Sequence, residues 1–311
     1  MTKEKYLYSF INILLIVVII LTATFCSNSD NQNNSVEKAN IKDGYKNLNI
    51  TILLDLSDRI SNKKNPDQYK KDIIFINNVL DAFKQFLGKK GVVHSEDKIK
   101  VIFYPSANYD LYQEIADSLN VDFSKYDFLE RKKLYDKITT LYNKNLKKLY
   151  SLASNAKTYN GSDLFNYFKH RVSDDCILSD SNFVNMLIIL TDGYIYEANS
   201  KYQDGNKFSY LIPEANHIKI FRKEYNWEEI FEKNNYGLIP LNNNLSSLCV
   251  LVGEINPPEN SPKDFDILKK YWSNWLESQH VKKENYKIIK TDLNTLNRDI
   301  IHNFFNKIIS L

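Results

Sequence analysis

The chain has 311 residues, of which 43% are hydrophobic and 25% charged, a composition typical of a globular protein that buries a core. Its formal net charge is only +3, because 41 basic residues are balanced by 38 acidic ones. Without a stripe of Lys and Arg, or a basic patch interleaved with aromatic residues, the sequence excludes a nucleic-acid-binding surface.

The first 26 residues have the pattern of an export leader. Lysines within 1–5 precede the uncharged stretch 6–25, which is followed directly by Cys26 and the polar residues 27–45. This order resembles a bacterial lipoprotein leader, in which a lipidated Cys26 becomes the new N-terminus and 27–45 is a tether. The alternative is a retained signal anchor, since the apolar stretch is long enough to span a bilayer. Both alternatives predict a membrane-anchored, extracytoplasmic domain over 46–311 in the cell envelope, in the periplasm or on the cell surface.

The elements beyond the tether alternate between strands and helices. In chain order we predict a strand at 48–54, a helix that opens at 65–67 and ends at Gly88, a strand at 99–104, a short helix at 111–119, a weak strand at 121–124, a helix at 131–154, a helix at 164–171, a strand at 183–190, an irregular segment at 194–223 with a few strand-like pieces, a strand at 248–252, a helix at 265–276, a strand at 286–289 and a helix at 296–309.

Three of the strands are largely apolar runs (48–54, 183–190 and 248–252), which is typical of strands buried on both faces of a parallel sheet. The alternation predicts a single α/β domain with a doubly wound, mostly parallel central sheet flanked by helices. Trp272 and Trp275 lie at helical spacing with leucines and are predicted to be core residues. Cys249 lies in an apolar run and Cys176 in a polar stretch, and a disulfide between them is an open alternative.

Oxygen-bearing side chains gather in three loops that leave a strand or open a helix. These loops contain Asp55 and Ser57, then Ser162 and Asp163, then Thr191 and Asp192. Loops at the carboxyl edge of one parallel sheet converge, so we expect these side chains to meet. Carboxylates and hydroxyls are the ligands that Mg²⁺ and Mn²⁺ prefer.

At this point the chain resembles the von Willebrand factor type A (vWA) domain, a Rossmann-like α/β fold that carries a metal-ion-dependent adhesion site. The matching motifs are Asp55-Leu-Ser57 after the first strand, Ser162 in the middle loop and Thr191-Asp192-Gly193 after a later strand. The resemblance covers 46–311. It implies that Mg²⁺ or Mn²⁺ is held by Asp55, Ser57, Ser162 and Asp192, and that the partner-binding rim consists of Arg59, Asp58, Asp163, Thr191 and Glu254.

Arg59 departs from this pattern, because it stands where the family has a second metal-binding serine and a guanidinium has only donors. Three arrangements are open. Arg59 points away and leaves the metal in place; or it pairs with Asp58 or another nearby carboxylate at the rim; or it replaces the charge of the metal and binds an acidic partner bidentately.

The resemblance implies a non-enzymatic, membrane-tethered protein-binding module for adhesion or assembly, whose partner presents a carboxylate to the metal. One alternative is a scaffold without metal that binds partners through Arg59 or through the tyrosine-rich segment 194–225. Another is a metal-dependent hydrolase with Asp58, Asp163 or Glu254 as the acid or base. The five histidines, which are scattered along the chain, are predicted to be surface or core residues (His94, His170, His217, His280 and His302).

Overall fold

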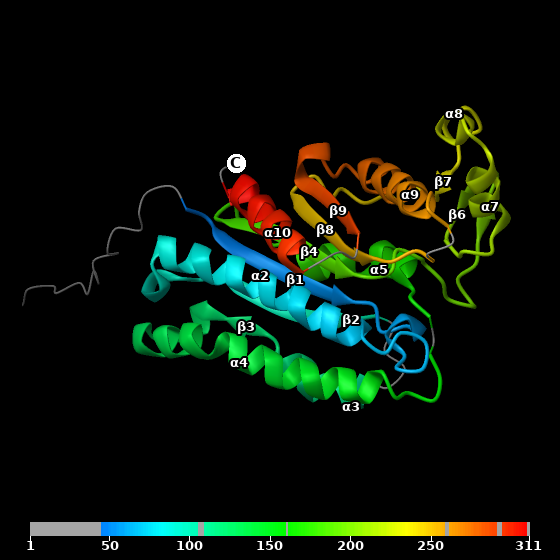
Figure 1. Ribbon diagram of the computed structural model, residues 1–311. Helices are drawn as coiled ribbons and strands as arrows, with labels where there is room; N and C mark the ends of the chain where they lie inside the picture. Colours follow the sequence, from blue (N-terminus) through cyan, green and yellow to red (C-terminus); the bar gives the residue numbers. More distant parts are fainter. Residues whose placement is uncertain (1–44, 105–108, 160, 259–260, 291–293, 310–311) are drawn as a thin grey trace, which may run out of the picture. The chain divides into compact units, whose positions relative to one another are not determined.

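A computed structural model describes residues 45–104, 109–159, 161–258, 261–290 and 294–309 (Figure 1). Residues Gly44–Leu311 form one compact unit. The predicted leader, its Cys26 and the tether up to residue 44 lie outside the described residues. Among the helices that the structure describes, none is long and apolar enough to cross a membrane.

A six-stranded sheet forms the centre of this unit, in the order β3-β2-β1-β4-β8-β9. Its strands are β1 (Asn47–Leu54), β2 (Lys98–Phe103), β3 (Val121–Asp122), β4 (Phe183–Leu190), β8 (Leu248–Ile255) and β9 (Tyr286–Lys290). Every pair of neighbours is parallel except β2 and β3, which pair antiparallel at one edge. The predicted mixed α/β architecture with a mostly parallel sheet is therefore confirmed.

Helices cover both faces of this sheet (Figure 1). One face packs against α2 (Gln68–Lys90), α3 (Tyr109–Ser118), α4 (Phe128–Ala153) and α10 (Asn294–Ile309). The other packs against α5 (Leu164–His170), α6 (Val172–Cys176) and α9 (Asp264–Ser278), with α7 (Asn216–Lys223) and α8 (Trp227–Lys233) beyond. Four single 3-10 turns complete the elements: η1 (Asp58–Ile60), η2 (Val92–His94), η3 (Phe123–Lys125) and η4 (Lys283–Asn285).

The central strands are largely apolar because both of their faces are buried. In β1, alternate residues from Leu48 to Leu54 enter the core on the α2 side, while Leu53 enters the core on the α9 side. On that second side, the amide of Asn49 and the hydroxyl of Thr51 donate to backbone carbonyls of α6. Helix α6 is therefore held on this face of the sheet by hydrogen bonds as well as by apolar contacts.

The first long helix ends later than the sequence predicted. Gly88 does not end α2, which continues to Lys90 and stops at Gly91 with φ 103°. The reason is that the amine of Lys90 is buried in an ion pair with Asp97 at 2.7 Å, which holds the last turn on the sheet. At the other end, Asp67 is the N-cap residue, within the range 65–67 predicted for the start of the helix.

The alternative of a Cys176–Cys249 disulfide is wrong, because both cysteines are free and buried. Cys176 belongs to the core on the α9 side of the sheet and Cys249 to the core on the α2 side. The sheet itself separates them. Burial raises the pKa of both thiols, to about 11 for Cys176 and about 12 for Cys249.

The connection between β4 and β8, residues 191–247, is more ordered than the sequence predicted. It contains α7, α8 and a second sheet of three short strands, β5 (Gln203–Asp204), β6 (Lys207–Phe208) and β7 (Gly237–Leu238). The predicted irregular segment 194–223 lies within it. The indoles of Trp272 and Trp275 are buried beneath it, as predicted, and Trp275 donates to the carbonyl of Ile239 at 3.0 Å.

Candidate functional site

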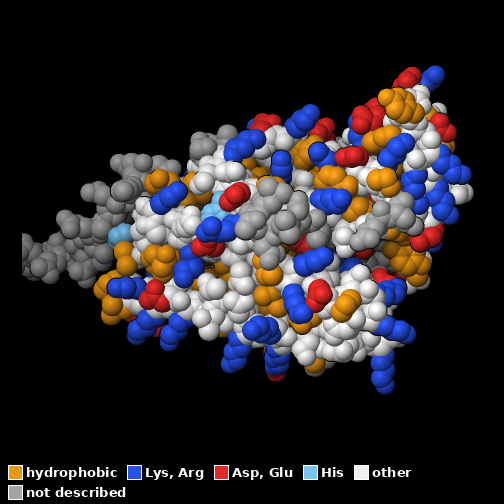
Figure 2. Space-filling model, viewed as in Figure 1, with side chains coloured by type: hydrophobic (Ala, Val, Ile, Leu, Met, Phe, Trp, Pro, Cys, Tyr) orange, Lys and Arg blue, Asp and Glu red, His pale blue; other side chains and the backbone are white. Residues whose placement is uncertain are grey.

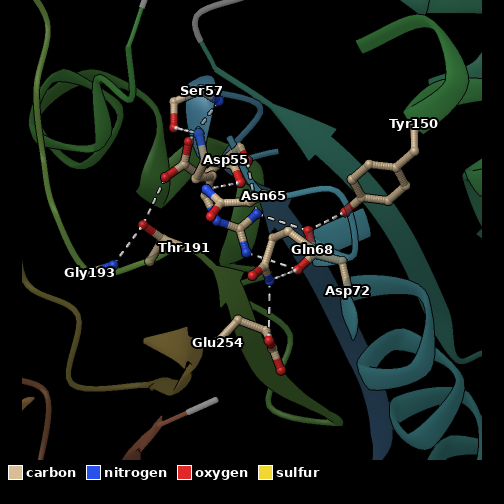
Figure 3. A network of polar contacts seen from close by, with 10 residues as sticks. Asp55, Ser57, Asn65, Gln68, Asp72, Tyr150, Thr191, Gly193 and Glu254 are labelled. Carbon is tan, nitrogen blue, oxygen red and sulfur yellow. Dashed lines mark hydrogen bonds and ion pairs between the residues drawn. The ribbon is translucent and has the colours of Figure 1, made fainter. Parts of the chain in front are cut away.

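Asp55 is the centre of the predicted site and lies directly after β1 (Figure 3). One carboxylate oxygen accepts from the backbone N–H of Ser57 at 2.9 Å. The other accepts from the hydroxyl of Thr191, which follows β4, at 2.8 Å. Parallel pairing of β1 with β4 brings these two loops together, as the sequence predicted. Both oxygens of Asp55 are therefore already hydrogen-bonded within the protein.

Arg59 lies in the core beside this group, with only 3% of its surface exposed. Its guanidinium forms a bidentate pair with Asp72 of α2, with both N–O distances at 2.8 Å, and donates to the backbone carbonyl of Asp55 at 3.2 Å (Figure 3). Burial alone would lower the pKa of Arg59, but the Asp72 carboxylate outweighs it and raises that pKa. The arginine is therefore a fixed internal cation.

Asp72 has no exposed surface and is satisfied by further donors. It accepts from the hydroxyl of Tyr150 at 2.7 Å and from the amide of Gln68 at 3.0 Å. Gln68 also donates to Glu254 at 3.2 Å, which joins α2 to β8 (Figure 3). Asp72 was not predicted as a site residue, although it lies one turn before Ile76 on the buried face of α2, a position that marks a buried acid needing a partner.

The structure therefore corrects two predicted arrangements of Arg59, the pairing at the rim and the binding of an acidic partner. Its partner is Asp72, and the pair lies in the core instead of at the rim. Asp58 is exposed and pairs with Lys64. A guanidinium that is held bidentately at 2.8 Å inside the protein does not present donors to an acidic partner.

The two acids expected beside the middle and last loops have structural roles. Asp163 accepts from the backbone N–H of Asn166 at 3.2 Å and so caps α5, and it accepts from Ser200 at 3.0 Å. Glu254, within β8, has φ 65° and accepts from Gln68. These contacts account for the predicted rim acids as parts of the framework.

Ser162 and Asp192 are the other two predicted metal ligands, but neither is hydrogen-bonded to Asp55 or Ser57 in the contacts of the described residues. Ser162 pairs through its backbone with Tyr196, and its buried hydroxyl has no partner among the described residues. One carboxylate oxygen of Asp192 accepts from the backbone N–H of Tyr194 at 3.0 Å. Burial, followed by the charge of Asp55, raises the pKa of Asp192 to about 7.

The raised pKa predicts a pH dependence of stability. In the unfolded chain the pKa of an aspartate is about 3.9, so the folded state binds the proton of Asp192 more tightly than the unfolded state does. The free energy of unfolding therefore falls as the pH rises from that value towards 7. Between those pH values we expect the free energy of unfolding of the wild type to fall by about 1–3 kcal/mol more than that of Asp192→Asn, a range that allows for the contact of Asp192 with solvent. Urea denaturation at several pH values measures both slopes, and parallel slopes would contradict the assignment.

The predicted metal-ion-dependent adhesion site is wrong. Within the part of the chain that the structure describes, no group of three or more His, Cys, Asp and Glu side chains is arranged to hold a metal ion. The physical reason is that Arg59 supplies a positive charge inside this loop cluster and the Asp55 oxygens accept from protein donors.

A second candidate surface lies on the tyrosine-rich segment 194–225. Tyr196, Tyr202 and Tyr225 are exposed by 38%, 54% and 99%. The amine of Lys201 lies 4.9 Å from the ring centre of Tyr196 and 5.4 Å from that of Tyr210. Figure 2 shows basic side chains gathered over α7 and β6, which lie within this segment.

The chain matches no protein-family model and no curated protein. Among solved structures it is similar to proximal thread matrix protein 1 from the mussel byssus, with 10% identity and a TM-score of 0.39, covering 85% of this chain and 48% of that one. It is also similar to the pilus adhesin SpaC from Lactobacillus rhamnosus GG, with 11% identity and a TM-score of 0.39, covering 85% and 30%. A mutant of the PilB minor pilin from Streptococcus sanguinis has 10% identity and a TM-score of 0.41, covering 86% and 62%.

These findings correct the assignment to the vWA family. No family model supports it, and the similar structures are described as a thread matrix protein, a pilus adhesin and a minor pilin. The chain spans less than two thirds of each of them. TM-scores of 0.39 to 0.41 assign neither a family nor a function to this chain.

Proposed function

We propose that the chain is a non-enzymatic protein-binding module of the cell envelope, and that it contacts its partner through the tyrosine-rich segment 194–225. The observation that carries the proposal is the exposure of Tyr196, Tyr202 and Tyr225 on one segment. Tyrosine is enriched in protein interfaces because a large ring gains contact area at a small cost in side-chain entropy.

The backbone of the segment is held in place at several points, which favours recognition by a preformed surface. Ile195 and Leu211 exchange backbone hydrogen bonds of 2.9 and 2.8 Å. Ser209 donates to the carbonyl of Ser200 at 2.6 Å and accepts from the backbone N–H of Tyr202 at 2.7 Å. A surface that is ordered before binding loses less conformational entropy when its partner docks.

We also propose how the module is anchored to a membrane and which chemical group its partner presents. The pattern of residues 1–26 supports a lipid-modified Cys26 or a signal anchor, either of which places the module outside the cytoplasm and on a membrane. Because Arg59 is sequestered in the core, a partner carboxylate would meet the lysines of the β4–β8 connection instead of a metal or the arginine.

Site-specific photo-crosslinking on intact cells tests the proposal. With p-benzoylphenylalanine in place of Tyr202 or Tyr225, we expect one protein adduct common to both positions. The control replaces Phe128, which is also exposed but begins α4 on the other side of the sheet, and we expect no adduct from it. With the adduct identified and purified, Tyr202→Ala should weaken its binding about tenfold or more. Adducts that are absent from 202 and 225, or equal at 128, would reject the proposal.

A further inference from the structure

A groove of about 670 Å³ lies between β6 and α7 in the β4–β8 connection. Its apolar lining includes Phe208, Ile212 and Tyr236. We call it the β6–α7 groove. It lies largely within the tyrosine-rich segment 194–225, to which all of its lining residues except Tyr236 belong.

The groove has an excess of positive charge that the protein does not neutralise. Lys201, Lys219 and Lys223 line it, against the single acidic residue Glu224. None of the three lysines takes part in an ion pair between described residues. By contrast, their neighbour Arg222 is paired with Asp264 at 2.7 Å and so is committed to the framework. Three unpaired amines around an apolar floor favour an anionic ligand.

His217 supplies an independent sign that a ligand enters the groove. Its ring lines the groove, stacks on Phe208 with the ring centres 3.7 Å apart and is only 5% exposed. Burial lowers the pKa of His217 to about 4, so the imidazole is neutral. Its Nε2 atom is buried and has no hydrogen-bond partner among the described residues. A buried polar atom without a partner is costly, and a ligand that brings a polar group would remove that cost.

We propose that the β6–α7 groove binds an acidic segment of a partner protein, with its carboxylates on Lys201, Lys219 and Lys223. The inference rests on the proposed protein-binding function and names the partner's chemistry. A peptide supplies what the groove lacks: carboxylates for the amines, apolar side chains for the floor, and backbone polar groups for Nε2 of His217. The cation–π contacts of Lys201 with Tyr196 and Tyr210 hold one of these charges in place before binding.

The test uses the full-length protein in detergent and a fluorescent, capped octapeptide of alternating glutamate and leucine. A matched peptide carries glutamine in place of glutamate. By fluorescence anisotropy at about 0.15 M salt, we expect the glutamate peptide to bind at least about tenfold more tightly than the glutamine peptide. The double variant Lys219→Gln/Lys223→Gln should lose about tenfold or more of that affinity, and His217→Phe, which keeps a flat aromatic ring, should lose a smaller factor.

Lys133→Gln on α4 is the matched control, since it removes an exposed lysine on the other side of the sheet. Equal affinity for the two peptides, or an equal loss in Lys133→Gln and the double variant, would overturn the inference in favour of unspecific charge attraction. The two proposals fail separately. A crosslinked partner at position 202 without peptide binding rejects the groove alone, whereas groove-dependent peptide binding without any crosslink rejects the tyrosine surface alone.

Discussion

Asp72→Ala is expected to lower the free energy of unfolding by about 3–5 kcal/mol, because it leaves the guanidinium of Arg59 buried without a counter-ion. The two residues are 0% and 3% exposed, so solvent cannot replace the missing carboxylate. The same change removes the acceptor of the Tyr150 hydroxyl and one acceptor of the Gln68 amide. Urea denaturation monitored by circular dichroism measures the difference.

Two further variants separate the charge from the contacts. Tyr150→Phe removes one hydrogen bond to Asp72 and should cost only about 1 kcal/mol. The double variant Arg59→Met/Asp72→Leu removes both charges and should recover much of the stability lost in Asp72→Ala. If Asp72→Ala were no less stable than Tyr150→Phe, the pair would not be the buried ion pair that the structure shows. Asp58→Ala, at an exposed pair with Lys64, should change stability by no more than about 0.5 kcal/mol.

Gly161→Ala is expected to have the second large effect, about 2–4 kcal/mol, because a side chain there has neither space nor a suitable backbone. A Cβ atom at Gly161 would lie 2.2 Å from the carbonyl oxygen of Tyr196, and φ is 84°. Ser162 forms its backbone hydrogen bonds with Tyr196 at the next residue. We therefore expect this variant to detach the start of the tyrosine-rich segment and to lower the yield of the crosslink at position 202.

Gly205→Ala is the matched control for backbone strain. Gly205 also has positive φ, 56°, but a Cβ atom there would meet nothing within 4 Å. Its expected cost is only about 1 kcal/mol, and its crosslinking should be unchanged. Thermal denaturation ranks the two variants, and equal melting temperatures would contradict the clash at Gly161.

The sheet was predictable because three of its strands are largely apolar runs. The prediction of 183–190 coincides with β4, and β1 and β8 differ from their predictions only at their ends. Such runs are stable only where both faces of the strand are buried. They therefore indicate a parallel sheet covered by helices on both sides. The convergence of Asp55, Ser57 and Thr191 followed from the parallel sheet in the same way.

The partner of Arg59 was not predictable from the same reasoning. The sequence shows a charged loop residue and an acid on a helix, but no periodicity states that their side chains meet in the core. Local motifs therefore suggested a metal site where the structure has an arginine–aspartate pair. Helix α7 was missed for a related reason. It is stabilised by tertiary hydrogen bonds to α9: Arg222 donates to Asp264, and the Tyr271 hydroxyl donates to the carbonyl of His217.

The positions of the tryptophans make their intrinsic fluorescence a probe of conformational change in this protein. The indole N–H of Trp272 donates to the carbonyl of Gly193, in the loop next to Asp192, at 2.9 Å. The indole N–H of Trp275 donates to the carbonyl of Ile239 in the β4–β8 connection, and Trp227, which belongs to that connection, packs against Phe221 of α7. Since the chain has only these three tryptophans, its tryptophan emission comes from side chains that contact Gly193, Ile239 and Phe221. Ligand-induced shifts at either surface should therefore be visible in unlabelled protein.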